Sequence, residues 1–325
     1  MLLAGLGACS RPPAAPPAKP WKVTVLQLDD GPETQAIVEG LTDELRKSSL
    51  QPERDYLIAV QSAHGIAGAL PELAEAAVRD GAHTLVAIGT PALQAARAAS
   101  KMTPVVFTDV GDPALAGVTP PSIWRRWLPF LFPPDGPPVT GAYAAGDFAP
   151  LLEASGAMLH GRLGAVVVGA DRDALGYRDG LRQAAGWASR QVDFETAGAA
   201  ADVGPAAARL CAHGAVGLVA LGDHVSNGGF EAVMRAARAC VIPVFGTLRV
   251  HADGGAAVTL ARDPIAAARE AGRMVARLAR GERPADIPVA ALTETTLIVN
   301  AAAAEQADVG IPFALIQNAD EVLGD

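Results

Sequence analysis

The regular alternation of short apolar runs with helical segments most constrains how this chain folds. Residues 82–117 show the pattern clearly, because the apolar run Leu85–Ile88 stops at Gly89-Thr90-Pro91 and an Ala-rich helical segment follows. A second apolar run, Pro104–Phe107, then ends at Thr108-Asp109. Strand, tight turn, helix and strand in this order indicate a βαβ unit of a parallel sheet. Ligands bind beyond the carboxyl ends of such strands, so this stretch predicts a small-molecule site.

The alternation continues from Lys22–Leu28 to Thr296–Val299, and a chain of 325 residues is long enough for two lobes. It predicts a doubly wound α/β fold with two Rossmann-like lobes and a hinge. The segment Thr119–Val139 interrupts the pattern with prolines and four large aromatic residues. This segment forms a lid or a partner surface, or it is an excursion that packs on the nearest lobe; the sequence leaves both open.

The charge of the chain excludes some classes of partner. The formal net charge is −9, and the chain contains no basic cluster. Neither nucleic acid nor an anionic membrane surface is therefore an expected partner.

The amino terminus suggests a location outside the cytoplasm. Leu6-Gly7-Ala8-Cys9 resembles a bacterial lipobox, in which the Cys is lipidated, and the Pro/Ala-rich Ser10–Pro20 then forms a tether. The run before Cys9 lacks a basic n-region, so we expect residues 1–20 to be a truncated lipoprotein signal and tether, which either a start codon assigned too late or a trimmed sequence explains. The alternative is a disordered tail with an incidental cysteine.

Cys211 and Cys240 each follow a predicted helix and precede a strand. Helices that are consecutive on one face of a sheet are neighbours, so outside the cytoplasm these residues are able to form a disulfide. The alternative is a pair of buried small apolar side chains.

No motif in the chain supports catalysis or metal binding. The six histidines are scattered, and the sequence lacks GxSxG, GxxxxGK, HExxH and a GxGxxG after the first strand. We expect no enzymatic activity, no cofactor and no metal site.

Several polar residues at predicted strand ends have chemistry suited to a small ligand. Thr90 offers a hydroxyl and a backbone N–H at a helix start, where an anion is favoured, and Thr108 adds a second hydroxyl. Asp223, with Asp112 or Asp171, is able to accept hydrogen bonds from a ligand ammonium. For each residue alone, a helix cap or a turn is an equally good interpretation.

Blocks spread over most of the chain resemble one family. The family is that of ABC-transporter substrate-binding proteins with the type I periplasmic-binding fold, in the branch whose better-known members bind tryptophan or tyrosine. The matching blocks are Val25-Leu26-Gln27, Glu39-Gly40-Leu41, Val139-Thr140-Gly141, Ile242-Pro243-Val244-Phe245, Leu297-Ile298-Val299-Asn300, Gly310-Ile311-Pro312 and Ala319-Asp320-Glu321-Val322.

The resemblance implies a binding pocket, but the pocket positions are less faithful than the rest. Gly31, Val168 and Leu248 stand where the family usually has His, Asn and Asp, so an aromatic amino acid does not follow as the ligand. The expected ligand-binding set is Asp29, Asp30, Gly89, Thr90, Thr108, Asp112, Asp171, Asp223, His224 and Thr247.

The function implied is that of a monomeric, lipid-anchored binding protein that captures a small polar metabolite outside the cytoplasm and presents it to an ABC permease in the inner membrane. The expected first lobe comprises residues 21–141 and 247–289, and the second comprises 142–246 and 290–325. The alternative is a ligand-sensing domain that signals to a membrane partner. A cytoplasmic repressor is disfavoured because no basic helix-turn-helix precedes the lobes.

Overall fold

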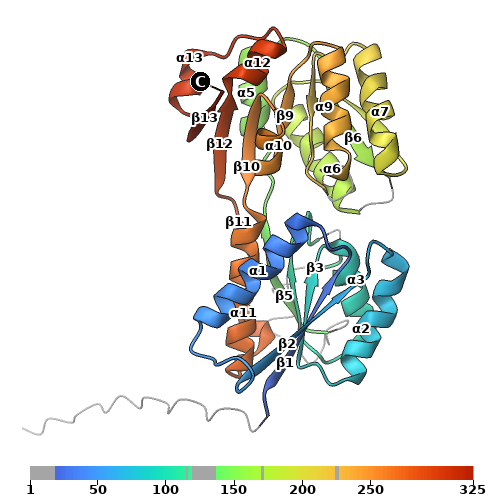
Figure 1. The fold of residues 1–325 in the computed structure, drawn as a ribbon, viewed down its shortest axis with the longest axis vertical. Helices are drawn as coiled ribbons and strands as arrows, with labels where there is room; N and C mark the ends of the chain where they lie inside the picture. Colours follow the sequence, from blue (N-terminus) through green and yellow to red (C-terminus); the bar gives the residue numbers. More distant parts are fainter. Residues whose placement is uncertain (1–18, 115, 119–136, 170–171, 224–226, 325) are drawn as a thin grey trace, which may run out of the picture.

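The computed structural model describes residues 19–114, 116–118, 137–169, 172–223 and 227–324. They form two α/β lobes stacked along the long axis of the molecule, each built on its own sheet (Figure 1). This confirms the fold class expected from the alternation of strands and helices. Most of the aromatic-rich segment Thr119–Val139 lies outside the described residues, as do Cys9, Asp171 and His224.

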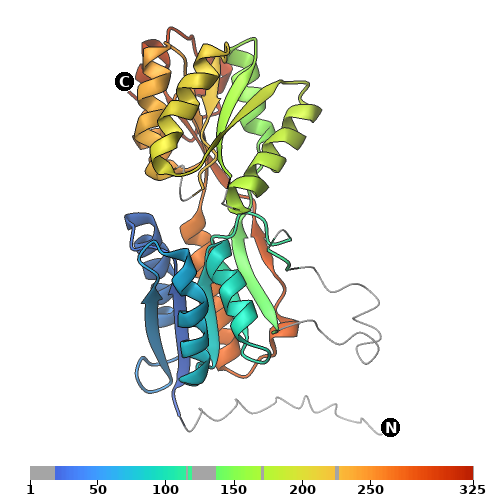
Figure 2. The ribbon, with the colours of Figure 1, turned by 90° about the vertical axis from the view of Figure 1, so that its right-hand side faces the viewer.

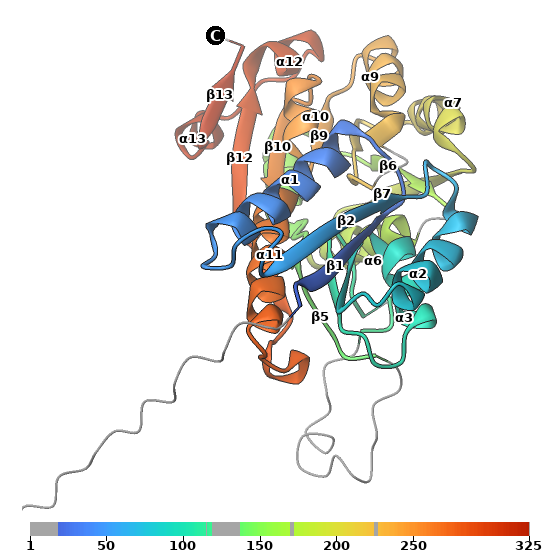
Figure 3. The ribbon, with the colours of Figure 1, turned by 60° about the horizontal axis from the view of Figure 1, so that its bottom comes forward.

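The first lobe has a parallel sheet in the order β11-β5-β4-β3-β1-β2. Helices α1 and α11 pack together on one face of it, and α2 and α3 cover the other (Figures 1 and 3). Its strands are β1 Trp21–Gln27, β2 Tyr56–Ser62, β3 Thr84–Ile88, β4 Val105–Thr108, β5 Val139–Ala144 and β11 Ala290–Leu292. Its helices are α1 Pro32–Lys47, α2 Leu70–Arg79, α3 Thr90–Ala99 and α11 Pro264–Ala279, with 3₁₀ turns at Ala67–Ala69 and Pro284–Asp286.

The second lobe has a sheet in the order β13-β12-β10-β9-β8-β6-β7, in which the pair β10–β12 is antiparallel. Its strands are β6 Leu163–Val168, β7 Val192–Ala197, β8 Gly217–Val219, β9 Val244–Gly246, β10 Val258–Arg262, β12 Thr295–Asn300 and β13 Glu321–Leu323. Its helices are α5 Ala149–Met158, α6 Arg172–Trp187, α7 Ala200–Ala212, α9 Phe230–Ala239, α10 Arg249–Asp253, α12 Ala301–Gln306 and α13 Phe313–Gln317.

The chain passes between the lobes after β5, after β10 and after β11 (Figure 2). We expected the first lobe to include 247–289 and the second to begin its last segment at 290. Instead, β10 pairs with β9 and β12 in the second sheet, and β11 pairs with β5 in the first. Residues 247–262 therefore belong to the second lobe, and 290–292 belong to the first.

The three connections fix the orientation of the strands. Strand β5 runs parallel to β4 and leads from its carboxyl end straight into the second lobe, while β10 leads from its carboxyl end back to the first. The carboxyl ends of the parallel strands in the two sheets therefore face each other across the hinge. Gly141 permits the close approach of β5 and β4, because a Cβ there would overlap the Phe107 carbonyl and ring.

Both cysteines in the described part of the chain are free thiols. They lie at the carboxyl ends of the packed helices α7 and α9, and the Cys211 Sγ is 3.8 Å from the Ala236 carbonyl of α9. Burial, followed by the neighbouring Cys240 thiol, raises the pKa of Cys211 to about 12. Cys240 is exposed, so the interpretation of two buried apolar side chains does not hold for it. In the part of the chain that the structure describes, we find no helix with the length and apolar character that a membrane crossing requires.

Candidate ligand-binding site between the two lobes

The first-lobe side of the site is built on the ends of β1, β3 and β4. Gly89, in the left-handed region at φ 81°, donates its N–H to the Thr108 carbonyl at 3.0 Å and so joins the ends of β3 and β4. A glycine suits this position because a side chain is strained at positive φ. Thr90 begins α3 and is only 2% exposed. The structure therefore places Gly89, Thr90 and Thr108 together, as the sequence predicted.

At the ends of β1 and β4, two buried polar atoms lack a hydrogen-bond partner among the described residues. They are the Thr108 hydroxyl and the Gln27 Oε1, and their side chains are 0% and 5% exposed. A buried polar group without a partner costs about 1–3 kcal/mol, so a ligand that completes the bonding of these two atoms would gain from contact with them. A ligand that donates to Gln27 and bonds with the Thr108 hydroxyl satisfies both.

Asp29 and Asp30 have local structural roles. The Asp29 Oδ1 accepts hydrogen bonds from the Gly31 N–H at 2.8 Å and the Thr34 hydroxyl at 3.0 Å, which ties down the start of α1. Asp30 accepts from Gln27 Nε2 at 2.9 Å and pairs with His64 Nδ1 at 2.6 Å. The hydrogen bond with His64 holds the pKa of Asp30 below its usual value. Asp30 therefore orients Gln27.

On the second lobe, Asp223 follows β8 and Thr247 follows β9, and both residues are buried, at 2% and 7% exposed. The Thr247 hydroxyl donates to the Ala220 carbonyl at 3.0 Å and accepts from Arg262 at 3.2 Å. This hydroxyl therefore both donates and accepts a hydrogen bond within the protein. Thr247 supports the loop geometry, whereas Asp223 brings a buried carboxylate to the strand ends.

Arg262, the last residue of β10, organises the loop before Asp223. Its guanidinium donates to the Leu221 carbonyl at 3.3 Å and the Gly222 carbonyl at 2.7 Å, and it stacks 4.4 Å from the Tyr177 ring centroid. At 5% exposure the guanidinium is well shielded from water. Arg262 therefore holds the backbone that carries Asp223 against α6.

A cavity of about 530 Å³ lies beside Tyr177, and of the expected ligand-binding set Asp112 alone is among its described lining residues. Tyr177 lines it from the second lobe, and Asp112 and Tyr143 line it from the first. Burial, followed by the charge of Asp112, raises the pKa of Tyr143. The Asp112 carboxylate also accepts a hydrogen bond from the Ala114 N–H at 2.8 Å, as expected of a residue that opens a turn. Asp112 is therefore both a turn residue and a lining residue of the cavity. This volume suits a ligand of metabolite size.

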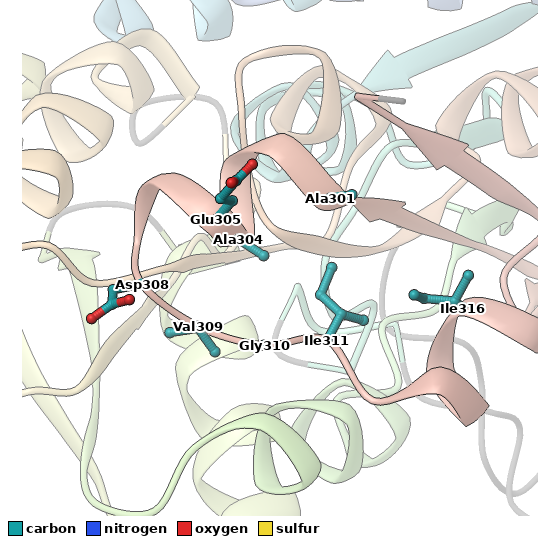
Figure 4. A pocket seen from close by; sticks show the side chains of 8 residues that line it. All are labelled: Ala301, Ala304, Glu305, Asp308, Val309, Gly310, Ile311 and Ile316. Atoms are coloured by element: carbon teal, nitrogen blue, oxygen red, sulfur yellow. The ribbon is translucent and has the colours of Figure 1, made fainter.

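A second pocket, of about 420 Å³, lies at the carboxyl end of the chain. Figure 4 shows its lining, which comes from α12 and the following segment to α13. Strand β12 runs antiparallel to β10, so Ala301 at its end lies on the edge of the sheet away from the other lobe. No residue of the expected set lines this pocket.

The sequence missed Gln27, Tyr177 and Arg262 as site residues. Gln27 ends β1 directly before the polar loop, a position that signals a site in a parallel sheet. Arg262 and Tyr177 gave no such signal, because their partners lie far away in the sequence. Among the described residues, no cluster of His, Cys, Asp and Glu is able to hold a metal ion.

Solved structures share this architecture. A conserved domain protein from Vibrio cholerae is 26% identical, with a TM-score of 0.83 over 94% of this chain and 100% of that one. A domain from Streptococcus pneumonia in complex with L-Trp is 20% identical, with a TM-score of 0.82 over 94% and 100%. A ligand-free, open substrate binding protein with adhesive properties from Clostridium difficile is 21% identical, with a TM-score of 0.68 over 94% and 99%.

None of the curated proteins matches this chain. The family model described as ABC transporter substrate binding protein matches residues 22–122 and 192–323, which is more than half of the chain. The two match regions cover the strand ends that carry Gln27, Thr90, Thr108, Asp223 and Arg262. The chain therefore belongs to the family of ABC transporter substrate binding proteins.

Proposed function

We propose that this protein binds a small polar metabolite between its lobes, outside the cytoplasm, and delivers it to the permease of an ABC importer. The observation that carries the proposal is a pair of buried atoms at the strand ends of the first lobe, Thr108 Oγ1 and Gln27 Oε1, for which the described residues offer no hydrogen-bond partner. These strand ends face those that carry Asp223. Polar groups of both lobes thus converge on a ligand, and binding favours the arrangement in which the lobes approach each other.

The chemistry of the site favours an amino acid or a related zwitterion. The start of α3 at Thr90 suits a carboxylate, and the buried Asp223 carboxylate suits an ammonium group. The Streptococcus protein was solved with L-Trp, and more distant neighbours were solved with 5-methylthioribose and D-allose. Val168 and Leu248 are buried apolar residues here, so this site offers fewer polar contacts than the family pattern implies.

Capture and release require no bond to be made or broken, and we propose that the protein is not an enzyme. A monomer anchored through a lipid on Cys9 would remain close to its permease. Mass analysis of membrane fractions, with Cys9→Ser as the unlipidated control, tests the anchor.

We expect an amino-acid ligand to lose affinity about 10- to 100-fold in the Asp223→Asn variant. The substitution keeps the shape of the side chain and removes the charge, and a hydrogen bond to a charged group contributes about 1.5–3 kcal/mol. Thermal stabilisation by a panel of amino acids and polar metabolites, followed by calorimetry on each hit, measures the effect.

Asp193→Asn is the matched control, because it removes a half-exposed carboxylate of the same lobe that pairs with Arg162 at 3.4 Å. This variant should bind like the wild type. A panel in which no compound stabilises the wild type would contradict the proposed function, and an unchanged affinity in Asp223→Asn would remove Asp223 from the site.

A further inference from the structure

A chain of three hydrogen bonds runs from the core of the second lobe to the first helix of the other lobe. The Thr247 N–H donates to His251 Nδ1 at 3.1 Å, and His251 Nε2 lies 2.9 Å from Asn227 Oδ1. The Asn227 Nδ2 then donates to Glu33 Oε2 at 3.0 Å. Glu33 lies in the first turn of α1, so the last bond joins the two lobes.

The two ends of this chain fix the direction of every bond in it. A backbone N–H only donates, so His251 Nδ1 is the acceptor and its proton sits on Nε2. A carboxylate only accepts, so the amide nitrogen of Asn227 faces Glu33 and its oxygen faces His251. Each group thus has one arrangement that satisfies its neighbours.

His251, in the middle of this hydrogen-bond chain, is buried and packed. His251 is 1% exposed and stacks on Phe230, with ring centroids 4.5 Å apart. Burial, followed by the charge of Arg262, lowers the pKa of His251 to about 3, so the ring is neutral at physiological pH. The Asn227 N–H also donates to the Asp223 carbonyl at 2.9 Å. The backbone of the residue that contacts the first lobe is therefore tied to the backbone of Asp223.

We propose that the Asn227–Glu33 hydrogen bond, oriented by His251, is a latch that sets the balance between apposed and separated lobes. The latch joins the loop after β8 to the start of α1, which lies beside the Asp29–Asp30 loop. The approach of the two lobes therefore depends on the positions of the loop after β8 and of the Asp29–Asp30 loop. The inference concerns the lobes themselves and does not depend on which ligand binds.

The test measures the distance between the lobes in the ligand-free protein. Spin labels are placed at Met102→Cys on the first lobe and Trp187→Cys on the second, where the native side chains are 83% and 75% exposed. The three native cysteines are replaced by alanine, and pulsed electron paramagnetic resonance gives the distribution of label distances. We expect Asn227→Asp, which sets a carboxylate against Glu33, to reduce the apposed population roughly tenfold.

A charge-swap variant separates the latch from a general disturbance of the loop. Glu33→Lys alone faces an amide N–H with an ammonium group and should also separate the lobes, whereas Asn227→Asp with Glu33→Lys restores an opposite-charge pair and should restore the wild-type distribution. Glu33→Gln keeps an acceptor for Asn227 and should change little. A wild-type distribution in Asn227→Asp, or continued separation in the double variant, would overturn the latch and leave the proposed function untouched.

Discussion

Replacing Thr108 by Val is expected to weaken ligand binding about tenfold or more while leaving the fold as stable as the wild type, or more stable. Valine has the shape of threonine, and the Thr108 hydroxyl is fully buried without a partner among the described residues. Its removal takes away a polar group that costs about 1–3 kcal/mol in the empty protein, and also takes away a bond that the ligand makes. Calorimetric titration and urea denaturation measure the two effects separately.

Thr259→Val is the matched control for this result. The Thr259 hydroxyl lies inside β10, is also fully buried and likewise has no hydrogen-bond partner in the described part of the chain. The control should gain stability in the same way and keep its ligand affinity. If Thr108→Val binds as the wild type does, the Thr108 hydroxyl is a packing feature without a role in recognition.

Replacing Arg262 by Met is expected to lower the free energy of unfolding by about 3 kcal/mol. Methionine fills part of the volume but leaves the Leu221 and Gly222 carbonyls without their donor, and each buried orphan costs about 1–3 kcal/mol. The stacking on Tyr177 is lost as well. Because Gly222 precedes Asp223, we also expect weaker ligand binding than the stability loss alone would produce.

Arg79→Met serves as the control for Arg262. Arg79 is an exposed residue of α2 whose ion pair with Glu75, at 3.5 Å, stays in solvent, and such pairs contribute little. Urea denaturation of both variants should show a clear loss for Arg262→Met and almost none for Arg79→Met. Equal transitions in the two proteins would mean that the Arg262 contacts are dispensable.

The sequence predicted the parts of the molecule that depend on local order. Apolar runs ending at Gly89-Thr90 and at Thr108 indicated strands and their carboxyl ends, and the structure places these residues side by side. The lobe boundaries were harder to predict, because a short apolar run such as β10 does not reveal its partners. Its pairing with β9 and β12 assigns it to the second lobe.

The roles of polar residues in the site depended on contacts between distant parts of the chain. Asp29 and Asp30 were predicted as ligand contacts, and in the structure they also hydrogen-bond to the start of α1, to Gln27 and to His64. Arg262 donates hydrogen bonds to carbonyls some forty positions earlier in the chain, and no sequence motif predicts these contacts. Sequence patterns predicted which end of the sheet carries the site. Which of its residues support the loops and which are available to a ligand could be seen only in the folded structure.

Native mass spectrometry of the protein purified from cells without refolding tests the central claim most directly. If the two lobes capture a small metabolite, the spectrum should contain a bound species of a few hundred daltons, and that species should decrease in Thr108→Val but not in Thr259→Val. A wild-type protein that is empty, and that no metabolite of the panel stabilises, would contradict the proposed ligand site between the two lobes.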